Sequence, residues 1–218
     1  MKFTPQRLTL TTVIVLAVAL FGLVAWQRLA PQPAAAAFTG DFDLETQPMI
    51  GDPDAPATIV AFEDFKCPVC KAFEDDAYPQ IVNELVETGQ AKLYFMNYQF
   101  LGPDSTTAGI AGECALAQDE VAFWDYKTYV YRAQGPESEA WATPELLVDL
   151  AREYVPALDA DELASCIDER RFEDAVAADY ELGQQAGVDA TPTVFVNGQK
   201  LESWGFEAVQ AAVAAAQP

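Results

Sequence analysis

The chain has 218 residues, 51% of them hydrophobic and 21% charged, a composition typical of one globular domain with short additional segments. Its net charge of −22 repels phosphate backbones and argues against nucleic-acid binding. Histidine is absent, which excludes serine–histidine and cysteine–histidine catalytic pairs and histidine-ligated metals. We therefore expect cysteine to carry any chemistry.

The N-terminal segment is long and apolar. Residues Leu8 to Trp26 include no charged side chain, and as a helix they would span about 30 Å, the thickness of a bilayer's hydrocarbon core. Lys2 and Arg7 precede the segment and favour a cytoplasmic N-terminus. We expect residues 1–7 in the cytoplasm, residues 8–27 as a single-pass anchor in the cell membrane, and residues 28–43 as a linker. The alternative is a signal peptide cleaved near Ala34–Ala37, which would release a secreted or periplasmic protein.

The next segment predicts a strand–helix–strand unit. Thr58–Phe65 is an apolar, β-prone run that leads into Cys67, and a helix is expected from Pro68 to about Glu87. Pro79 should kink or divide this helix. Lys92–Phe100 reads as a second strand, parallel to the first.

A helical stretch is predicted over residues 104–186. Two helix starts are visible within it: Thr143, which precedes a proline, and Asp159, which precedes Glu162 in the manner of a capping box. The chain should then close with a strand at Thr193–Val196, a tight turn at Asn197–Gly198, a return strand that begins at Lys200–Leu201, and a helix at Phe206–Ala216.

A C-x-x-C motif, Cys67-Pro68-Val69-Cys70, lies at the predicted strand-to-helix junction. Unpaired N–H groups at a helix N-terminus stabilise a thiolate at the first cysteine, and the second is placed to resolve a mixed disulfide. Two other interpretations are half of a zinc site and a purely structural disulfide. The first needs a second ligand pair, which the distant Cys114 and Cys166 do not form, and the second closes only a four-residue ring.

The sequence has five landmark segments: Gly51–Pro56, Phe62–Cys70, Phe100–Ser105, Cys114–Tyr126 and Gly187–Gly198. Together these segments resemble the DsbA-like branch of the thioredoxin superfamily. The resemblance implies an α/β thioredoxin fold over residues 44–218, with a central mixed sheet, an inserted helical subdomain at about 104–186, and the transmembrane helix before it. It also assigns Thr191-Pro192 to the cis-proline loop that faces the C-x-x-C and binds substrate. The alternative is that this proline only marks the start of a strand and has no functional role.

Two positions depart from this family's pattern. Many members carry a buried acid six residues before the first cysteine, where this chain has Ala61. Glu63 has the same strand parity, so we expect it to act as the proton relay instead. The best-known oxidases have histidine where this chain has Val69, and we therefore expect a potential lower than about −120 mV, the value typical of a strong oxidase.

Cys114 and Cys166 are the remaining cysteines. In an oxidising compartment a disulfide between them is the simplest interpretation, and many DsbA-like proteins carry a bond here. A ring of this length would contribute about 4 kcal/mol of stability. Two buried free thiols are the alternative.

These features predict an extracytoplasmic enzyme that oxidises exported proteins carrying reduced cysteines through the Cys67–Cys70 disulfide. We expect no metal and no cofactor beyond that disulfide, and re-oxidation by a membrane quinone-linked partner of the DsbB or VKOR type. Two alternatives stay open. One is a membrane-tethered reductase or isomerase, and the other is a non-catalytic binding or chaperone module on the same fold.

Overall fold

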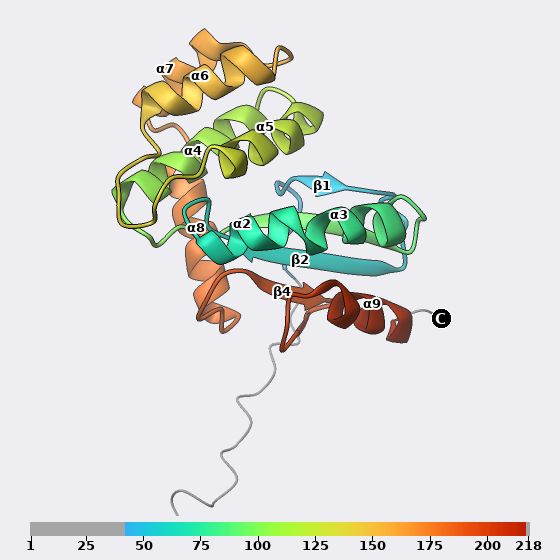
Figure 1. Ribbon diagram of the computed structural model, residues 1–218. Coiled ribbons are helices and arrows are strands. Elements are labelled where there is room, and N and C mark those ends of the chain that lie inside the picture. The colour runs from blue at the N-terminus through green and yellow to red at the C-terminus, as the bar shows by residue number, and fades with distance from the viewer. Residues whose placement is uncertain (1–41, 217–218) are drawn as a thin grey trace, which may run out of the picture. The chain divides into compact units, whose positions relative to one another are not determined.

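The computed structural model describes residues 42–216, as a strand–helix–strand unit, five inserted helices and a closing strand–strand–helix unit (Figure 1). The elements are β1 (Met49–Ile50), β2 (Ala57–Glu63), α2 (Pro68–Asp75), α3 (Ala77–Ile81), a π-helical turn (Val82–Val86), β3 (Ala91–Asn97), α4 (Pro103–Leu116), α5 (Glu120–Arg132), α6 (Pro144–Tyr154), α7 (Ala160–Asp168), α8 (Glu173–Gln185), β4 (Thr193–Val196), β5 (Gln199–Lys200) and α9 (Phe206–Ala215).

The predicted membrane segment, residues 8–27, lies outside the described residues. Within residues 42–216, no helix combines the length and the apolar character needed to cross a membrane.

The five strands form one mixed sheet in the order β1-β3-β2-β4-β5. The central strand β2 runs parallel to β3, with Glu63 opposite Asn97, and antiparallel to β4, with Phe62 opposite Thr193. The expected mixed sheet is confirmed. The antiparallel pairing places the C-terminal end of β2 beside the N-terminal end of β4, although the two segments are more than a hundred residues apart in the chain.

The two faces of β2 contribute to different parts of the core. Ile59 and Ala61 belong to a large apolar cluster that includes residues of α2, α3, α9 and the inserted helices. Val60 and Phe62 point the other way, into a smaller cluster lined by α8. Both faces are buried, which is why the strand reads as an uninterrupted apolar run. Because side chains alternate along a strand, Glu63 points to the same side as Ala61.

The predicted long helix after Cys67 is divided earlier than its proline. α2 ends at Asp75 and α3 begins at Ala77, so the break lies at Asp76 and not at Pro79. Pro79 has no N–H to donate to the carbonyl of Asp75, and its ring crowds that carbonyl. The helix therefore breaks directly after Asp75, the residue whose carbonyl would have accepted the missing hydrogen bond.

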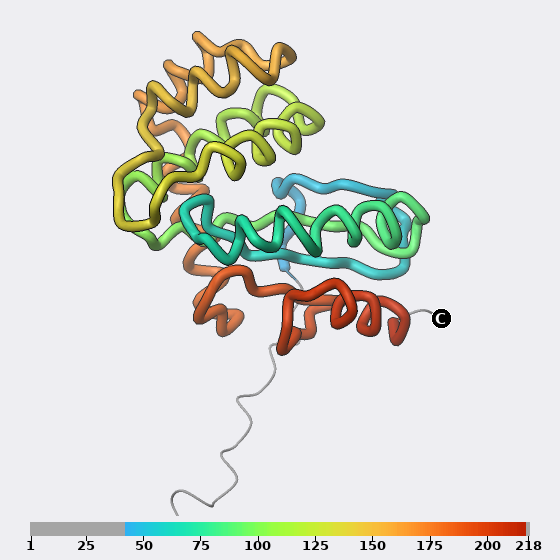
Figure 2. Tube along the Cα trace, in the orientation of Figure 1, coloured from blue at the N-terminus to red at the C-terminus, as the bar shows by residue number. Residues whose placement is uncertain are grey.

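The insertion consists of α4 to α8, and Figures 1 and 2 show α6 and α7 stacked beyond α4 and α5, while α8 leads back to the sheet. Both predicted helix starts are confirmed. Thr143 accepts a hydrogen bond from the N–H of Leu146 at 3.3 Å, and Asp159 accepts from the N–H groups of Asp161 and Glu162. Glu162 does not complete a capping box, because its carboxylate pairs with Arg171 instead.

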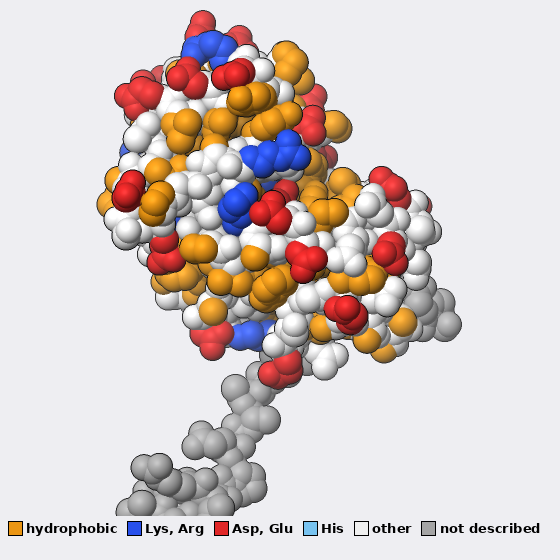
Figure 3. Space-filling view, viewed as in Figure 1, with side chains coloured by type: hydrophobic (Ala, Val, Ile, Leu, Met, Phe, Trp, Pro, Cys, Tyr) orange, Lys and Arg blue, Asp and Glu red, His pale blue; other side chains and the backbone are white. Residues whose placement is uncertain are grey.

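Acidic side chains are spread over the face drawn in Figure 3, with the Lys and Arg side chains interspersed among them. This distribution suits a solvated acidic surface, which keeps a protein of this net charge soluble.

Candidate active site

Cys67 lies between the end of β2 and the start of α2. Its backbone is extended, with φ −71° and ψ 120°, and it is the N-cap residue of the helix, followed directly by Pro68. Its carbonyl accepts the N–H of Lys71 at 3.1 Å, the first bond of the helix. Cys67 is 7% exposed, whereas Cys70 is fully buried, so an incoming sulfur atom reaches Cys67 first.

The two thiols have opposite acidities. The pKa of Cys67 is lowered to about 6, mainly by a hydrogen bond from Cys70, against the opposing effect of burial and with further help from the N–H groups of Cys70 and Val69. The pKa of Cys70 is raised well above its ordinary value, first by burial, then by its bond to Cys67 and by the charge of Glu63. At neutral pH, Cys67 is therefore largely a thiolate and Cys70 a thiol.

The loop that precedes β4 lies against Cys67. The Thr191–Pro192 peptide bond is cis, and Cys67, in its protonated form, donates to the Thr191 carbonyl oxygen at 3.3 Å. Thr191 itself is 7% exposed. The structure thus brings together the two sequence-predicted pairs, Cys67–Cys70 and Thr191–Pro192. Val69, between the cysteines, is 44% exposed and contributes an apolar surface beside the reactive sulfur.

Glu63 is buried near Cys70, on the face of β2 that the helices cover. Burial raises its pKa to about 7, Lys127 opposes that rise, and Glu74 adds to it. Tyr131 donates its hydroxyl hydrogen to Glu63 Oε2 at 2.9 Å. The structure therefore places the carboxyl predicted as the proton relay where its charge acts on Cys70. Ala61 leaves the usual acid position without a titratable group.

Asp64 anchors the loop between β2 and α2. Its Oδ2 accepts hydrogen bonds from the backbone N–H groups of Phe100 and Leu101 and from the Ser105 hydroxyl, at 2.8–3.1 Å. Its Oδ1 accepts the N–H of Lys66 at 2.8 Å. The sequence pattern did not single out this residue. One charged side chain thereby holds the β3–α4 loop beside the cysteines, with bonds of the stronger, charge-assisted kind.

Gln134 attaches the loop between β2 and α2 to the inserted helices. It follows α5, and its Nε2 donates to the carbonyl oxygens of Phe65 at 2.8 Å and Cys67 at 3.1 Å. The backbone on both sides of Lys66 is therefore fixed by a residue nearly seventy positions later in the chain. Nothing in the local sequence around Gln134 signals this contact.

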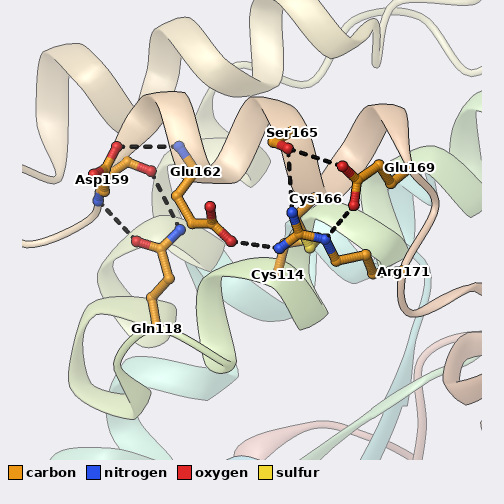
Figure 4. The surroundings of a disulfide bond; sticks show 8 residues. All are labelled: Cys114, Gln118, Asp159, Glu162, Ser165, Cys166, Glu169 and Arg171. Atoms are coloured by element: carbon orange, nitrogen blue, oxygen red, sulfur yellow. Dashed lines mark hydrogen bonds and ion pairs between the residues drawn. A yellow bond between two sulfur atoms is a disulfide. The ribbon is translucent and has the colours of Figure 1, made fainter.

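Cys114 and Cys166 form a disulfide, with an S–S distance of 1.98 Å and 6.0 Å between the Cα atoms. It joins α4 to α7, and Figure 4 shows the polar bonds that flank it. Gln118, on the α4 side, accepts the N–H of Asp159 at 2.8 Å and donates to its carbonyl at 3.2 Å. The bond lies within the insertion and contributes no group to the site around Cys67.

Lys127 is the buried charge that the sequence analysis missed. Its side chain is 1% exposed and lies in α5 among aromatic residues. A signal was available: Phe123, Lys127 and Tyr131 recur every four residues and so share one face of the helix. A lysine in the middle of an apolar helical face implies a buried partner of opposite charge.

The comparisons with known proteins agree with this geometry. A family model described as Thioredoxin matches residues 43–215. Disulfide bond formation protein D of Bacillus subtilis (strain 168) is 34% identical over 168 residues, which cover 77% of this chain and 75% of that protein.

Solved structures resemble the chain over most of its length. The oxidised form of BdbD from Bacillus subtilis superimposes with a TM-score of 0.78 at 32% identity, covering 83% of this chain and 97% of that chain. DsbA from Chlamydia trachomatis gives a TM-score of 0.73 at 27% identity, covering 84% of this chain and 96% of that chain.

Proposed function

The chain belongs to the thioredoxin family and is a DsbA-like, extracytoplasmic thiol–disulfide oxidoreductase, and from this premise we propose that it oxidises cysteine pairs of exported proteins. The observation that carries the proposal is the opposite acidity of the two thiols. A stabilised thiolate at Cys67 favours the reduced enzyme, and an oxidoreductase whose reduced form is favoured gives its disulfide away.

The proposed reaction has two exchanges. A client thiolate attacks Cys67 Sγ of the Cys67–Cys70 disulfide, and Cys70 leaves and takes up a proton. The second client thiolate then attacks the client sulfur of the mixed disulfide, and Cys67 leaves as a thiolate. The client loses two electrons and the enzyme gains them, so no cofactor beyond the enzyme's own disulfide is needed. A thiol of low pKa is the faster leaving group, so Cys67 is suited to leave in the second exchange.

Thr191 and Pro192 are proposed to hold the client. The Thr191 carbonyl is within 3.3 Å of Cys67 Sγ, so a peptide chain that lies along this loop would bring its cysteine to the reactive sulfur. The exposed side chain of Val69 supplies apolar contact on the other side.

The strength of the oxidant should be intermediate. A pKa of about 6 at Cys67 lies between about 7 for thioredoxin and about 3.5 for DsbA. We therefore expect a potential between about −270 mV and about −120 mV. This agrees with an exposed valine at position 69, which cannot stabilise the thiolate as a histidine would.

The enzyme is also proposed to be membrane-tethered and to be re-oxidised by a membrane quinone-linked protein of the DsbB or VKOR type. The support is the uncharged segment at residues 8–27 and the similarity to disulfide bond formation protein D of Bacillus subtilis. A protein that gives its own disulfide away needs an oxidant to restore it. Carbonate extraction of membranes and N-terminal sequencing of the purified protein test the anchor. Release of the protein together with a new N-terminus after residue 30 would show a cleaved signal instead.

The direction of the reaction is tested with two substrates. The oxidised enzyme should restore disulfides to a reduced, unfolded protein faster than the reduced enzyme cleaves the disulfides of insulin. Cys67→Ser should abolish both activities. Strong insulin reduction with little oxidative refolding would assign a reductase, and unchanged activity of Cys67→Ser would remove the enzyme function altogether.

A further inference from the structure

Arg132 is an exposed cation at the end of α5 that has no acidic partner. Within residues 42–216, every other lysine and arginine side chain bonds a carboxylate or a backbone carbonyl. Arg132 instead lies over an aromatic ring, with its Cζ 5.3 Å from the ring centre of Tyr129. The ring uses none of the guanidinium N–H groups, so they stay free for an acceptor.

Two surface hollows meet at this arginine. The first, of about 290 Å³, lies between α5 and the helices that follow Cys67, and the second, of about 320 Å³, lies between α5 and α6. Figure 1 shows the order of these helices, with α5 between α6 and the α2–α3 pair. Because Arg132 lines both hollows, they form one groove across the end of α5, which we call the α5 groove.

The side of the α5 groove toward α6 is aromatic and apolar. The exposed Tyr154 stacks on Tyr129, with 4.6 Å between the ring centres and 13° between the ring planes. Leu150, which is buried, lines the same hollow. This side therefore offers contact to an apolar side chain, directly beside the free guanidinium.

Acids line the side toward α2, but each of them has a cation of its own. Glu74 pairs with the buried Lys127 and accepts a hydrogen bond from the Thr128 hydroxyl. Asp75 pairs with Lys71 at 3.3 Å. The charge of the groove that remains unpaired is thus positive. Its complement is a carboxylate that is followed or preceded by an apolar side chain.

The α5 groove begins close to the reactive cysteine. Gln134, two residues after Arg132, donates a hydrogen bond to the Cys67 carbonyl oxygen at 3.1 Å. Two residues of backbone span at most about 7 Å. A polypeptide joined to Cys67 therefore needs only a short stretch of its own chain to reach the groove. Joining also raises its effective concentration there, so that even a weak contact counts.

We propose, resting on the function above, that the α5 groove is a second contact site for client polypeptides. Arg132 binds a client carboxylate through paired N–H···O bonds, and the hollow beside Leu150 and Tyr154 takes the neighbouring aromatic or aliphatic side chain. The groove selects among clients and takes no part in the disulfide exchange itself.

The test uses the full-length oxidised enzyme and reduced peptides with two cysteines and an Asp-Phe pair placed between about two and eight residues from the nearer cysteine. A matched series carries Asn-Phe. At one spacing, the Asp-to-Asn ratio of the second-order rate constants of oxidation should be about threefold to tenfold higher in the wild type than in Arg132→Gln. Comparing ratios cancels the effect of the acid on the peptide's own cysteines. The excess should shrink as salt is added, because an exposed ion pair is screened.

Control variants separate recognition from a structural effect. Arg152→Gln removes an exposed arginine of α6 that pairs with Asp149 and Asp161, so the ratio should stay at the wild-type value. Arg132→Glu should reverse the preference and favour Lys-Phe peptides at the same spacing, a result that loss of folding would not produce. Tyr154→Ala should reduce the advantage of Asp-Phe over Asp-Gly peptides.

An Asp-to-Asn ratio that is the same in the wild type, Arg132→Gln and Arg132→Glu at every spacing overturns this inference but leaves the proposed function intact. A wild type that oxidises none of the peptides through Cys67 overturns the proposed function instead.

Discussion

Cys67 and Cys70 are separated by two residues, yet their surroundings differ in every respect that sets a thiol's acidity. Cys67 is the N-cap, where its sulfur receives hydrogen bonds from Cys70 and from backbone N–H groups. Cys70 lies one turn inside the helix, fully buried and close to the negative charge of Glu63. The first sulfur is therefore a good nucleophile and leaving group, and the second keeps its proton until a base removes it.

The hydrogen bond between the two thiols is testable in isolation. Cys70→Ala removes the strongest influence that lowers the pKa of Cys67. We expect that pKa to rise from about 6 by about one unit or more, and the variant to be less reactive at pH 7. Thiolate absorbance as a function of pH measures it directly, with Val69→Ala as a control that leaves the bond in place. A Cys67 pKa unchanged in Cys70→Ala would show that the helix N-terminus alone stabilises the thiolate.

Which side chains could be predicted depended on how local their partners are. Glu63 could be assigned from strand parity, because alternation along β2 is a local property. Lys127 could not, since its partners Glu63 and Glu74 are more than fifty residues away and meet it only when α5 packs on α2. Gln134 and Asp64 were missed for the same reason: each binds the backbone of a distant loop.

Among the elements, the inserted helices carry both the structural disulfide and the residues that reach the active site. α4 and α7 are joined by Cys114–Cys166, while α5, packed against α4, supplies Lys127 and Tyr131. The element boundaries that could be predicted were those marked by a cap, such as Thr143 and Asp159. The two-residue strands β1 and β5 carry too little pattern of their own, and pairing with β3 and β4 defines them.

Removal of the structural disulfide should affect stability and not redox chemistry. Its ring spans 52 residues, and opening it in Cys114→Ala/Cys166→Ala should lower the free energy of unfolding by about 4 kcal/mol. Urea unfolding measures this change. The Cys67–Cys70 equilibrium with glutathione should be retained. A potential that moves by more than about 30 mV, a tenfold change in that equilibrium, would instead mean that the bond shapes the active site.

At the scale of the whole molecule, one half-buried and one buried carboxyl group also lie on the sheet side of the insertion. Glu113 in α4 accepts a hydrogen bond from the Asn97 side chain, and Asp179 in α8 accepts the Asn97 N–H and the Gln47 side chain. Burial, with repulsion from Asp179, raises the pKa of Glu113 to about 7, and burial raises that of Asp179 to about 6. The folded chain therefore holds protons that the unfolded chain has lost.

This difference predicts that stability falls as pH rises. A carboxyl whose pKa is raised on folding contributes fully below its unfolded value and loses that contribution as pH passes its folded value. For Glu113 this window lies between about 4.5 and about 7. Thermal unfolding at pH 5 and pH 8 with a chelator, so that no cation neutralises the pair, should show a lower midpoint at pH 8.

Glu113→Gln should recover on the order of 2 kcal/mol of this loss, whereas the exposed Glu84→Gln should recover none. If Glu113→Gln leaves the pH dependence of unfolding as it was, the Glu113–Asp179 pair is not its source.

The burial of Cys114 and Cys166 has a consequence for how the protein matures. Their residues are 1% and 3% exposed, so no external oxidant can reach them once α4 and α7 have packed together. The bond must form while the exported chain is still unfolded, when the chain is itself a substrate for disulfide formation. Whatever oxidant forms this bond must therefore act before the inserted helices have packed together.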